Sequence, residues 1–331
     1  MPKKLAFIFV PAFLLAGLAA ALGKMGLMPW AGSHFHGLLM LNGFTGGLIT
    51  AEKVMARADG VRVSAYWLVV VGMLITLAGI EMASVFVAIA GLLLVWDELA
   101  HPAAGHRTDS LLHVLAFFCL TMANVKFFRT GFIPDAILFW QGFVVLMILS
   151  TRIKKMGASQ SYTLLAGLIF YFISLWLPFH LVGQAITGGT LFVLAVWLFV
   201  REVRHSKAGS LMYGAAYFWL AVSGASMLLA DQILYSFDFM IHSLFLGFLF
   251  SMIFLHVSEA ILNRVSGQVI DGKPVFWTGL LALGLLIRLA GGDLLENSLA
   301  RQLGGVLNVA TLLGFFGFVG VKLIKAKRNE G

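Results

Sequence analysis

The stretch HFHGLLMLNGFTGGLITAEKVMA, residues His34–Ala56, decides the class of fold. No residue between His36 and Glu52 carries a charge, and a helix that crosses a bilayer needs about 20 mostly apolar residues. About eleven further stretches of similar character occur elsewhere in the 331-residue chain. The sequence therefore predicts an all-α polytopic membrane protein.

The overall composition agrees with this class. Hydrophobic residues make up 60% of the chain and charged residues 11%, and the mean hydropathy is +0.95. Soluble proteins carry roughly 45–50% apolar and about 25% charged residues, so a soluble domain, a disordered chain and a secreted disulfide scaffold are excluded. The single cysteine, Cys119, cannot form an intrachain disulfide and lacks the spacing of a zinc or c-type haem motif.

About twelve apolar segments are long enough to span a bilayer, and only short connections separate them. Residues 1–331 are therefore expected to form one integral membrane domain in contact with lipid. The predicted spans are 5–23, 33–55, 62–80, 82–99, 109–128, 132–150, 160–179, 182–202, 210–230, 237–261, 275–291 and 301–324.

The distribution of the basic residues along the chain indicates the membrane topology. The net charge is +8, but the basic residues lie in short clusters between apolar runs and form no nucleic-acid motif. If the N-terminus is cytoplasmic, all but five of the 23 lysines and arginines fall in cytoplasmic segments. Because basic residues favour the cytoplasmic side, this bias predicts that both termini are cytoplasmic.

A glycine–phenylalanine pair recurs along the chain at intervals of about 100 residues. LNGF contains Gly43, WQGF contains Gly142 and FLGF contains Gly247, in the second, sixth and tenth predicted spans. The common interval corresponds to four helices. It predicts three four-helix repeats at about 1–105, 106–208 and 209–331.

Ionisable side chains inside a membrane are candidates for function because they are costly to bury there. The predicted topology sorts the nine histidines by depth. Four lie toward the outer surface, and these are His34, His36, His180 and His242. His113 and His256 lie toward the cytoplasm, and the sequence leaves open whether they bind a ligand or serve the structure.

We expect His36 and His242 to bind a cofactor near the outer surface. Both begin their spans at a similar depth, and Gly43 lies on the same helical face as His36, which would leave room for a flat ligand. Two imidazoles can hold a b-type haem, and with His34 or His180 nearby they could instead hold copper. The alternative is that these histidines are polar residues that hydrogen-bond between helices.

Carboxylates cluster toward the two predicted surfaces. Asp97, Glu98 and Asp109 lie toward the cytoplasm, and Asp231 and Asp238 lie toward the outside. Such groups can form a proton path, but anchoring of helix ends is the interpretation that the sequence favours.

The stretches HFHGLLMLNGFTGGLITAEKVMA and IHSLFLGFLFSMIFLHVSEAIL (Ile241–Leu262) resemble the NnrS family of bacterial membrane proteins. The resemblance implies twelve spans with pseudo-threefold symmetry, a layout shared with the haem–copper oxidase catalytic subunit. It also implies a bacterial inner-membrane location, and it matches His34, His36 and His242 to haem- or copper-associated positions. Asp135 and Gln141 stand in the sixth span, where the oxidases carry a histidine motif, so oxygen reduction and proton pumping are not implied.

These observations lead to one expected function and two alternatives. The resemblance implies a haem-binding, and in one version copper-binding, protein of redox or nitric-oxide-related stress handling, with a redox protein or quinol as partner. The first alternative is a transporter or channel-like protein that uses the same helices without a cofactor. The second is a cofactor-free scaffold. No motif for catalysis on nucleotides or esters is present in the sequence.

Overall fold

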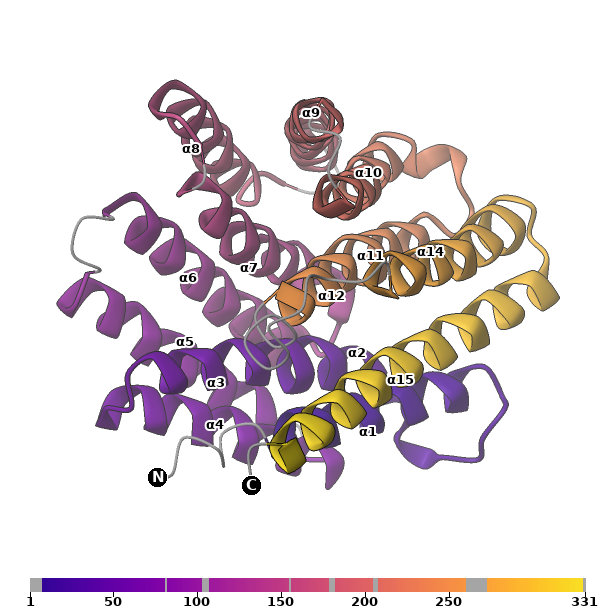
Figure 1. Cartoon of the computed structure of the whole chain (residues 1–331), viewed down its shortest axis with the longest axis horizontal. Coiled ribbons are helices and arrows are strands. Elements are labelled where there is room, and N and C mark those ends of the chain that lie inside the picture. The colour runs from indigo at the N-terminus through magenta and orange to yellow at the C-terminus, as the bar shows by residue number, and fades with distance from the viewer. Residues whose placement is uncertain are drawn as a thin grey trace. The chain divides into compact units, whose positions relative to one another are not determined.

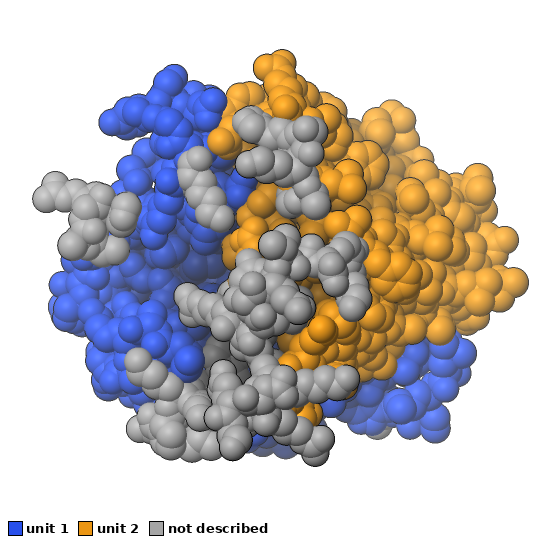
Figure 2. Space-filling model, in the orientation of Figure 1, with its two compact units in different colours: residues 1–168 blue, residues 169–331 orange. Residues whose placement is uncertain are grey.

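The computed structural model describes residues 8–329 except 81, 103–106, 155, 179–181, 205–207 and 260–272. Every regular element in this part of the chain is helical, as the sequence predicts. The chain divides into two compact units, residues 1–168 and 169–331, which Figure 2 shows in blue and orange. This division does not test the three predicted repeats of about 100 residues, which stay a prediction.

Unit 1 contains six described helices or helical composites that precede α8 (Figure 1). Its elements are α1 (Phe9–Lys24), η2 (Ala31–Phe35), α2 (His36–Leu38), η3 (Leu39–Gly46), α3 (Gly47–Ala56), α4 (Gly60–Leu77), α5 (Ala83–Ala100), α6 (Arg107–Thr130) and α7 (Ile133–Ile153). The α8 helix (Ala158–Ser174) crosses the boundary between the units.

Unit 2 contains a second set of helices (Figure 1). They are α9 (Gln184–Val203), α10 (Ala208–Leu228), η5 (Ala230–Gln232), α11 (Ser236–His242), η6 (Ser243–Phe250), α12 (Ser251–Val257), α14 (Lys273–Leu286), η8 (Ile287–Leu294) and α15 (Ser298–Asn329).

Nine helices within the described residues are long and apolar enough to cross a membrane, so the chain is a multi-pass membrane protein. Helical structure is also present at the other three predicted spans. There α1 has 16 residues, α8 has 17, and the second span is divided among η2, α2, η3 and α3. These three elements are shorter or less regular than a standard spanning helix. The count of twelve spans therefore stays a prediction.

Local chemistry explains where the helices of unit 1 begin and end. The Asp59 side chain caps the start of α4 by accepting a hydrogen bond of 2.9 Å from the Arg62 backbone N–H. Gly79 and Gly131 follow α4 and α6 with φ of +78° and +63°, a conformation that glycine adopts without a steric penalty. These short breaks make α4, α5, α6 and α7 consecutive packed neighbours.

The close packing of α5 on α6 depends on a small residue. A Cβ atom at Gly91 would lie 2.4 Å from Thr121 Oγ1 and 3.1 Å from the Phe117 carbonyl oxygen. Without a side chain at Gly91, the two helix backbones approach closely, as is common between membrane helices. This approach brings the ends of α5 and α6 together at the site described below.

Three eight-residue segments of the described chain are π-helical, namely η3, η6 and η8. Gly43 and Gly247 each take the fifth place in an eight-residue π-helix, whereas Gly142 lies in the regular helix α7. Two of the three repeat glycines therefore share a local backbone geometry. π-helical turns occur often at functional sites.

Candidate functional site

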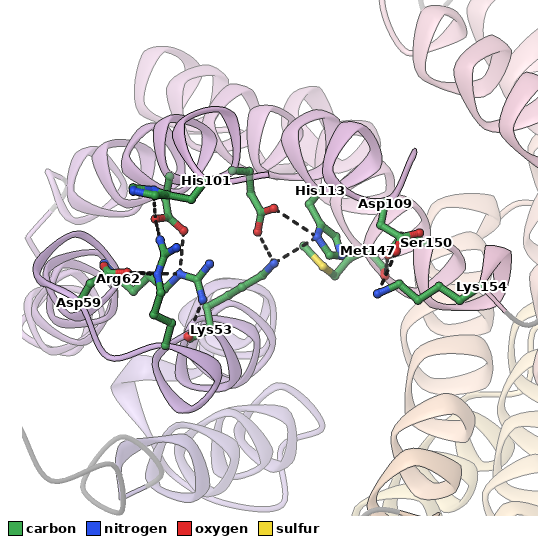
Figure 3. Close-up of polar contacts among 12 residues, drawn as sticks. Lys53, Asp59, Arg62, His101, Asp109, His113, Met147, Ser150 and Lys154 are labelled. Carbon is green, nitrogen blue, oxygen red and sulfur yellow. Dashed lines mark hydrogen bonds and ion pairs between the residues drawn. The ribbon is translucent and has the colours of Figure 1, made fainter. Parts of the chain in front are cut away.

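Ionisable side chains from α3, α4, α5 and α6 gather near the ends of these helices in unit 1 (Figure 3). Lys53 lies three residues before the end of α3, and Glu98 lies two residues before the end of α5. His113 lies in the second turn of α6. Because consecutive packed helices alternate in direction, these termini meet at one side of the unit.

Lys53, Glu98, His113 and Ser150 form a continuous chain of polar contacts. The Lys53 ammonium pairs with Glu98 Oε1 and also lies 3.1 Å from His113 Nδ1. The other oxygen of Glu98 lies 3.6 Å from the same Nδ1. On the far side of the ring, Ser150 Oγ lies 3.1 Å from His113 Nε2, and Figure 3 shows His113 between Lys53 and Ser150.

The partners of His113 determine which of its nitrogens carries the proton. An ammonium group can only donate, so Nδ1 accepts from Lys53 and the neutral ring is protonated at Nε2. Nε2–H then donates to Ser150 Oγ, which in turn donates to the Met147 carbonyl oxygen at 2.7 Å. This tautomer is assigned from the network of hydrogen bonds.

A second set of charges surrounds Asp97, whose side chain is 1% exposed. Arg62 Nε donates to Asp97 Oδ2 at 2.7 Å, and Arg57 pairs with the other carboxylate oxygen. Arg62 Nη1 also donates to the Lys53 carbonyl oxygen at 3.2 Å, which joins this set to the His113 chain. His101 lies at the exposed edge, 3.4 Å from Asp97.

Asp59 completes the Asp97 set from the start of α4. Partial burial acts to raise the pKa of Asp59, but hydrogen bonds from the Arg62 backbone N–H and the Arg57 side chain outweigh it. The pKa of Asp59 therefore lies below its ordinary value of 3.8. The carboxylate stays ionised and supports both the helix start and the arginines.

The charged side chains joined by these contacts balance in number. The cations are Lys53, Arg57 and Arg62, and the anions are Asp59, Asp97 and Glu98. His113 is the additional titratable group that these contacts bury, with a side chain 19% exposed. A proton on His113 would therefore give the group a net positive charge.

A separate ion pair lies near the same helix ends. Lys154 Nζ lies 2.8 Å from Asp109 Oδ2, and the Lys154 side chain is 46% exposed. Figure 3 shows this pair beyond Ser150. It provides a natural comparison for the His113 chain.

A second polar cluster is fully buried in the interior of unit 1. Asn42 of η3 donates to Asn124 of α6 at 2.7 Å, and Asn124 donates back at 3.2 Å. Trp140 Nε1 of α7 donates to Asn42 Oδ1 at 2.9 Å. Asn42 precedes Lys53 by eleven residues, which is roughly 16 Å along a helix. Thr45 and Thr50 are buried between them.

Of the histidines proposed to bind a cofactor, His34 and His36 lie in unit 1. His36 Nδ1 lies 2.8 Å from the Gly17 carbonyl oxygen of α1, and the His34 ring packs against Phe35. The space beside Gly43 is occupied, because a Cβ there would lie 3.1 Å from Phe13 and 3.3 Å from Met73. The side chains of α1 and α4 therefore fill the helical face on which the sequence predicted room for a flat ligand.

His242 lies in unit 2, and His180 lies outside the described residues. His242 Nδ1 lies 2.8 Å from the Asp238 carbonyl oxygen and 3.1 Å from Asp238 Oδ1. Arg288 Nη2 pairs with the other oxygen of Asp238 at 2.9 Å. The proposed pairing of His36 with His242 across a haem stays a prediction.

No three histidine, cysteine, aspartate or glutamate side chains come together in metal-binding geometry within the described part of the chain. A copper site would therefore need side chains from outside this part or a rearrangement of those within it. Copper, like haem, stays a prediction.

Glu98 and His113 were each named from the sequence, but nothing in the sequence joined them. Asp97, Glu98 and Asp109 were expected to anchor helix ends, and their ion pairs agree with that role. The role of His113 was open, and Lys53 and Ser150 were not among the candidates. The usable signal was polar side chains about one turn inside the ends of successive spans.

Comparison with known families identifies a family for this chain. A model described as a domain of unknown function, DUF8744, matches residues 4–323. No curated protein and no solved structure matches the chain. The match covers both units.

Proposed function

The chain belongs to the DUF8744 family, a domain of unknown function, and from its buried ion network we propose that it is a proton-conducting membrane protein. In this proposal His113 is the group of unit 1 that takes up a proton near the predicted cytoplasmic surface. The proposal sharpens the channel-like alternative from the sequence, because the network needs no cofactor. Its single carrying observation is that Lys53 and Glu98 both approach Nδ1 of one partly buried histidine.

The charge balance supports a role in proton uptake. Three cations and three anions already neutralise one another around a neutral His113. Burial makes an additional net charge costly, so a proton on His113 would be held only briefly unless a nearby anion supports it. Glu98 is that anion, since its Oε2 lies 3.6 Å from Nδ1. Such a site can accept and release a proton.

Protonation would change the contacts of His113 in a defined way. A proton on Nδ1 removes the lone pair that accepts from Lys53, and it turns attraction between the two groups into repulsion. The protonated ring would then donate to Glu98 Oε2, while Nε2–H keeps its bond to Ser150. Lys53 would share Glu98 with the imidazolium, so uptake of one proton would loosen the link between α3 and α6.

Polar groups continue from this site into the membrane along the second span. Thr50, Thr45 and Asn42 are buried on the path from Lys53 toward His36. Buried polar side chains are unusual in a membrane-spanning segment and often mark ion pathways. They supply hydrogen-bonding groups within unit 1 along which a proton could move between Lys53 and His36.

Proton flux into liposomes tests the proposal. The purified protein is reconstituted with an enclosed pH-sensitive dye, and a potassium diffusion potential with valinomycin drives proton entry. We expect wild-type flux well above that of protein-free liposomes and at least a tenfold loss in His113→Gln. The matched control is Lys154→Gln, which removes an ion pair at the same helix ends and should conduct like the wild type.

Two results would refute the proposal. One is wild-type flux equal to that of empty liposomes. The other is unchanged flux in His113→Gln when its circular dichroism and its elution in gel filtration equal those of the wild type.

Haem binding is the second candidate function, and one observation favours it. The Nδ1 atoms of His36 and His242 each lie 2.8 Å from a backbone carbonyl oxygen. This contact places the proton on Nδ1 and presents Nε2 as the ligand nitrogen, as in many metal-binding histidines. Each imidazole thus fits an axial role, but the packing beside Gly43 does not fit a macrocycle on that face. A bound haem would supply redox or nitric-oxide chemistry.

A further inference from the structure

In unit 2, α14 and η8 pack against α15 along a seam formed by glycines. A Cβ atom on Gly304 would lie 2.5 Å from the Arg288 backbone nitrogen and 2.6 Å from the Gly284 carbonyl oxygen. A Cβ atom on Gly284 would lie 2.3 Å from Asn308 Oδ1. The backbones of the two helices therefore approach closely, and their polar side chains are confined to the seam.

A salt bridge lies at one end of this seam. Arg301 Nε donates to Asp293 Oδ1 at 2.8 Å, and Arg301 Nη2 donates to the Gly292 carbonyl oxygen at 3.0 Å. The guanidinium also lies over the Tyr235 ring, 3.7 Å from its centroid. Arg301 is therefore held by three groups, of which Asp293 is only one.

Several polar atoms of the seam have no partner within the described residues. They are Asp293 Oδ2, Arg288 Nε and both amide atoms of Asn308. The Asp293 side chain is fully buried, and Asn308 is 2% exposed. Leaving a buried polar group unsatisfied costs about 1–3 kcal/mol. Four such atoms in one seam indicate that molecules from outside the chain satisfy them.

The geometry of the seam restricts what those molecules can be. Arg301 and Asn308 are seven residues apart on α15, which is on the order of 10 Å along the helix. One metal ion cannot reach groups spread over this distance, and Arg288 between them disfavours a cation. The close glycine contacts leave little space for a larger solute. Water is small and can both donate and accept hydrogen bonds, so it matches the unpaired donors and acceptors of the seam.

We propose that this seam holds a file of water molecules that leads to Asp293, and that Asp293 binds a proton on Oδ2. The inference deepens the proposed function by adding a second proton-binding group, in unit 2. The proton adds to the oxygen that lacks a protein partner, so the bond from Arg301 to Oδ1 need not break.

The charges around Asp293 permit this protonation. Protonation leaves Arg301 with its bonds to the Gly292 carbonyl and the Tyr235 ring, so no guanidinium loses all its partners. Arg288 keeps its pair with Asp238. The charged or titratable groups that face this end of the seam are Arg288 on η8, Arg301 on α15, Asp238 and His242 on α11, and Tyr235 before it.

Infrared difference spectroscopy after a pH jump tests the inference on the full-length protein in lipid. Protonation of a buried carboxylate produces a carbonyl band that is absent from the ionised form. We expect this band in the wild type, its loss in Asp293→Asn, and its retention in Asp231→Asn, which alters an exposed carboxylate of unit 2. A wild-type spectrum without a band assignable to Asp293 overturns the proton site.

Solvent deuterium tests the water file. The band shifts when its proton is replaced by deuterium, so its exchange rate measures the access of water to Asp293. We expect exchange within the mixing time in the wild type and at least a tenfold slower rate in Asn308→Leu, which keeps similar volume without the amide. Exchange as slow as that of the core backbone amides, or an equal rate in both proteins, overturns the water file.

The liposome flux assay and the infrared measurement together separate the two proposals. If proton conduction through unit 1 is wrong, liposome flux is absent while the Asp293 band and its exchange remain. If the Asp293 inference is wrong, the band is missing although the wild type conducts and His113→Gln does not.

Discussion

Replacement of Lys53 by methionine tests how strongly the buried network holds unit 1 together. The Lys53 side chain is 14% exposed and that of Glu98 is 6% exposed, so Lys53→Met leaves an almost fully buried carboxylate without its ammonium partner. Removal of one member of a buried ion pair costs about 3–5 kcal/mol. Because the Lys53 side chain is partly exposed to solvent, we expect a loss at the lower end of this range, about 3 kcal/mol in the free energy of unfolding.

The double variant Lys53→Met/Glu98→Leu isolates the pair from the rest of the site. Replacing both members of a buried ion pair by apolar residues is often neutral or stabilising. We therefore expect the double variant to recover most of the roughly 3 kcal/mol that Lys53→Met loses. The assay is equilibrium unfolding in mixed detergent micelles, followed by circular dichroism.

Lys154→Met provides the comparison for this measurement. Its partner Asp109 is 3% exposed, but Lys154 itself is 46% exposed, so water can replace its ammonium at the carboxylate and we expect a smaller loss than in Lys53→Met. A loss below about 1 kcal/mol in Lys53→Met would refute the view that the Lys53–Glu98 pair is buried and strongly coupled. Failure of the double variant to recover would show that Lys53 acts through partners other than Glu98.

Three further outcomes are expected. Asp59→Ala removes the cap of α4 and should cost about 1 kcal/mol in unfolding experiments at neutral pH. The folded-state pKa of Asp59 is lowered, so its contribution is present above its ordinary pKa of 3.8 and is lost as the pH falls through the lower folded value; a difference between variant and wild type that persists at still lower pH would contradict this role. Asn42→Leu should destabilise by about 1–3 kcal/mol because it leaves Asn124 without its amide partner, whereas Asn42→Leu/Asn124→Leu should be closer to the wild type in the same assay. If haem is bound, the purified protein has a Soret band that His36→Ala and His242→Ala abolish or shift, and its absence after expression with added haem would exclude the haem candidate.

Asp97 and Glu98 look alike in the sequence, but the charged groups around them give them different roles. Asp97 is neutralised by two arginines, and its histidine neighbour, His101, lies at the exposed edge, so Asp97 serves as an anchor of helix ends. Glu98 instead shares its two oxygens between Lys53 and a histidine that can change its charge. Adjacent carboxylates on one helix therefore serve different purposes, and only the identity of their partners distinguishes them.

The sequence alone determined the helical, multi-pass character of the protein, because length and apolarity are local properties of a segment and a bilayer accepts few alternatives. The Leu39–Gly46 part of the second span was expected to be a regular helix, but it is π-helical. Sequence reasoning had no local signal for this, since the shift to i→i+5 hydrogen bonds depends on how the helix packs against its neighbours.

The assembly of the His113 site was decided by the tertiary structure. Lys53 lies 45 residues from Glu98 and 60 from His113 in the chain, and Ser150 lies 37 residues beyond His113. Hydrophobic periodicity indicates that each of these residues is on a helix, but not which neighbouring helix its side chain meets. That choice depends on rotation and depth, which are set by contacts such as Gly91 against Thr121 between segments far apart in sequence. The charged residues were visible in the sequence, and their partnership arises only when the helices pack.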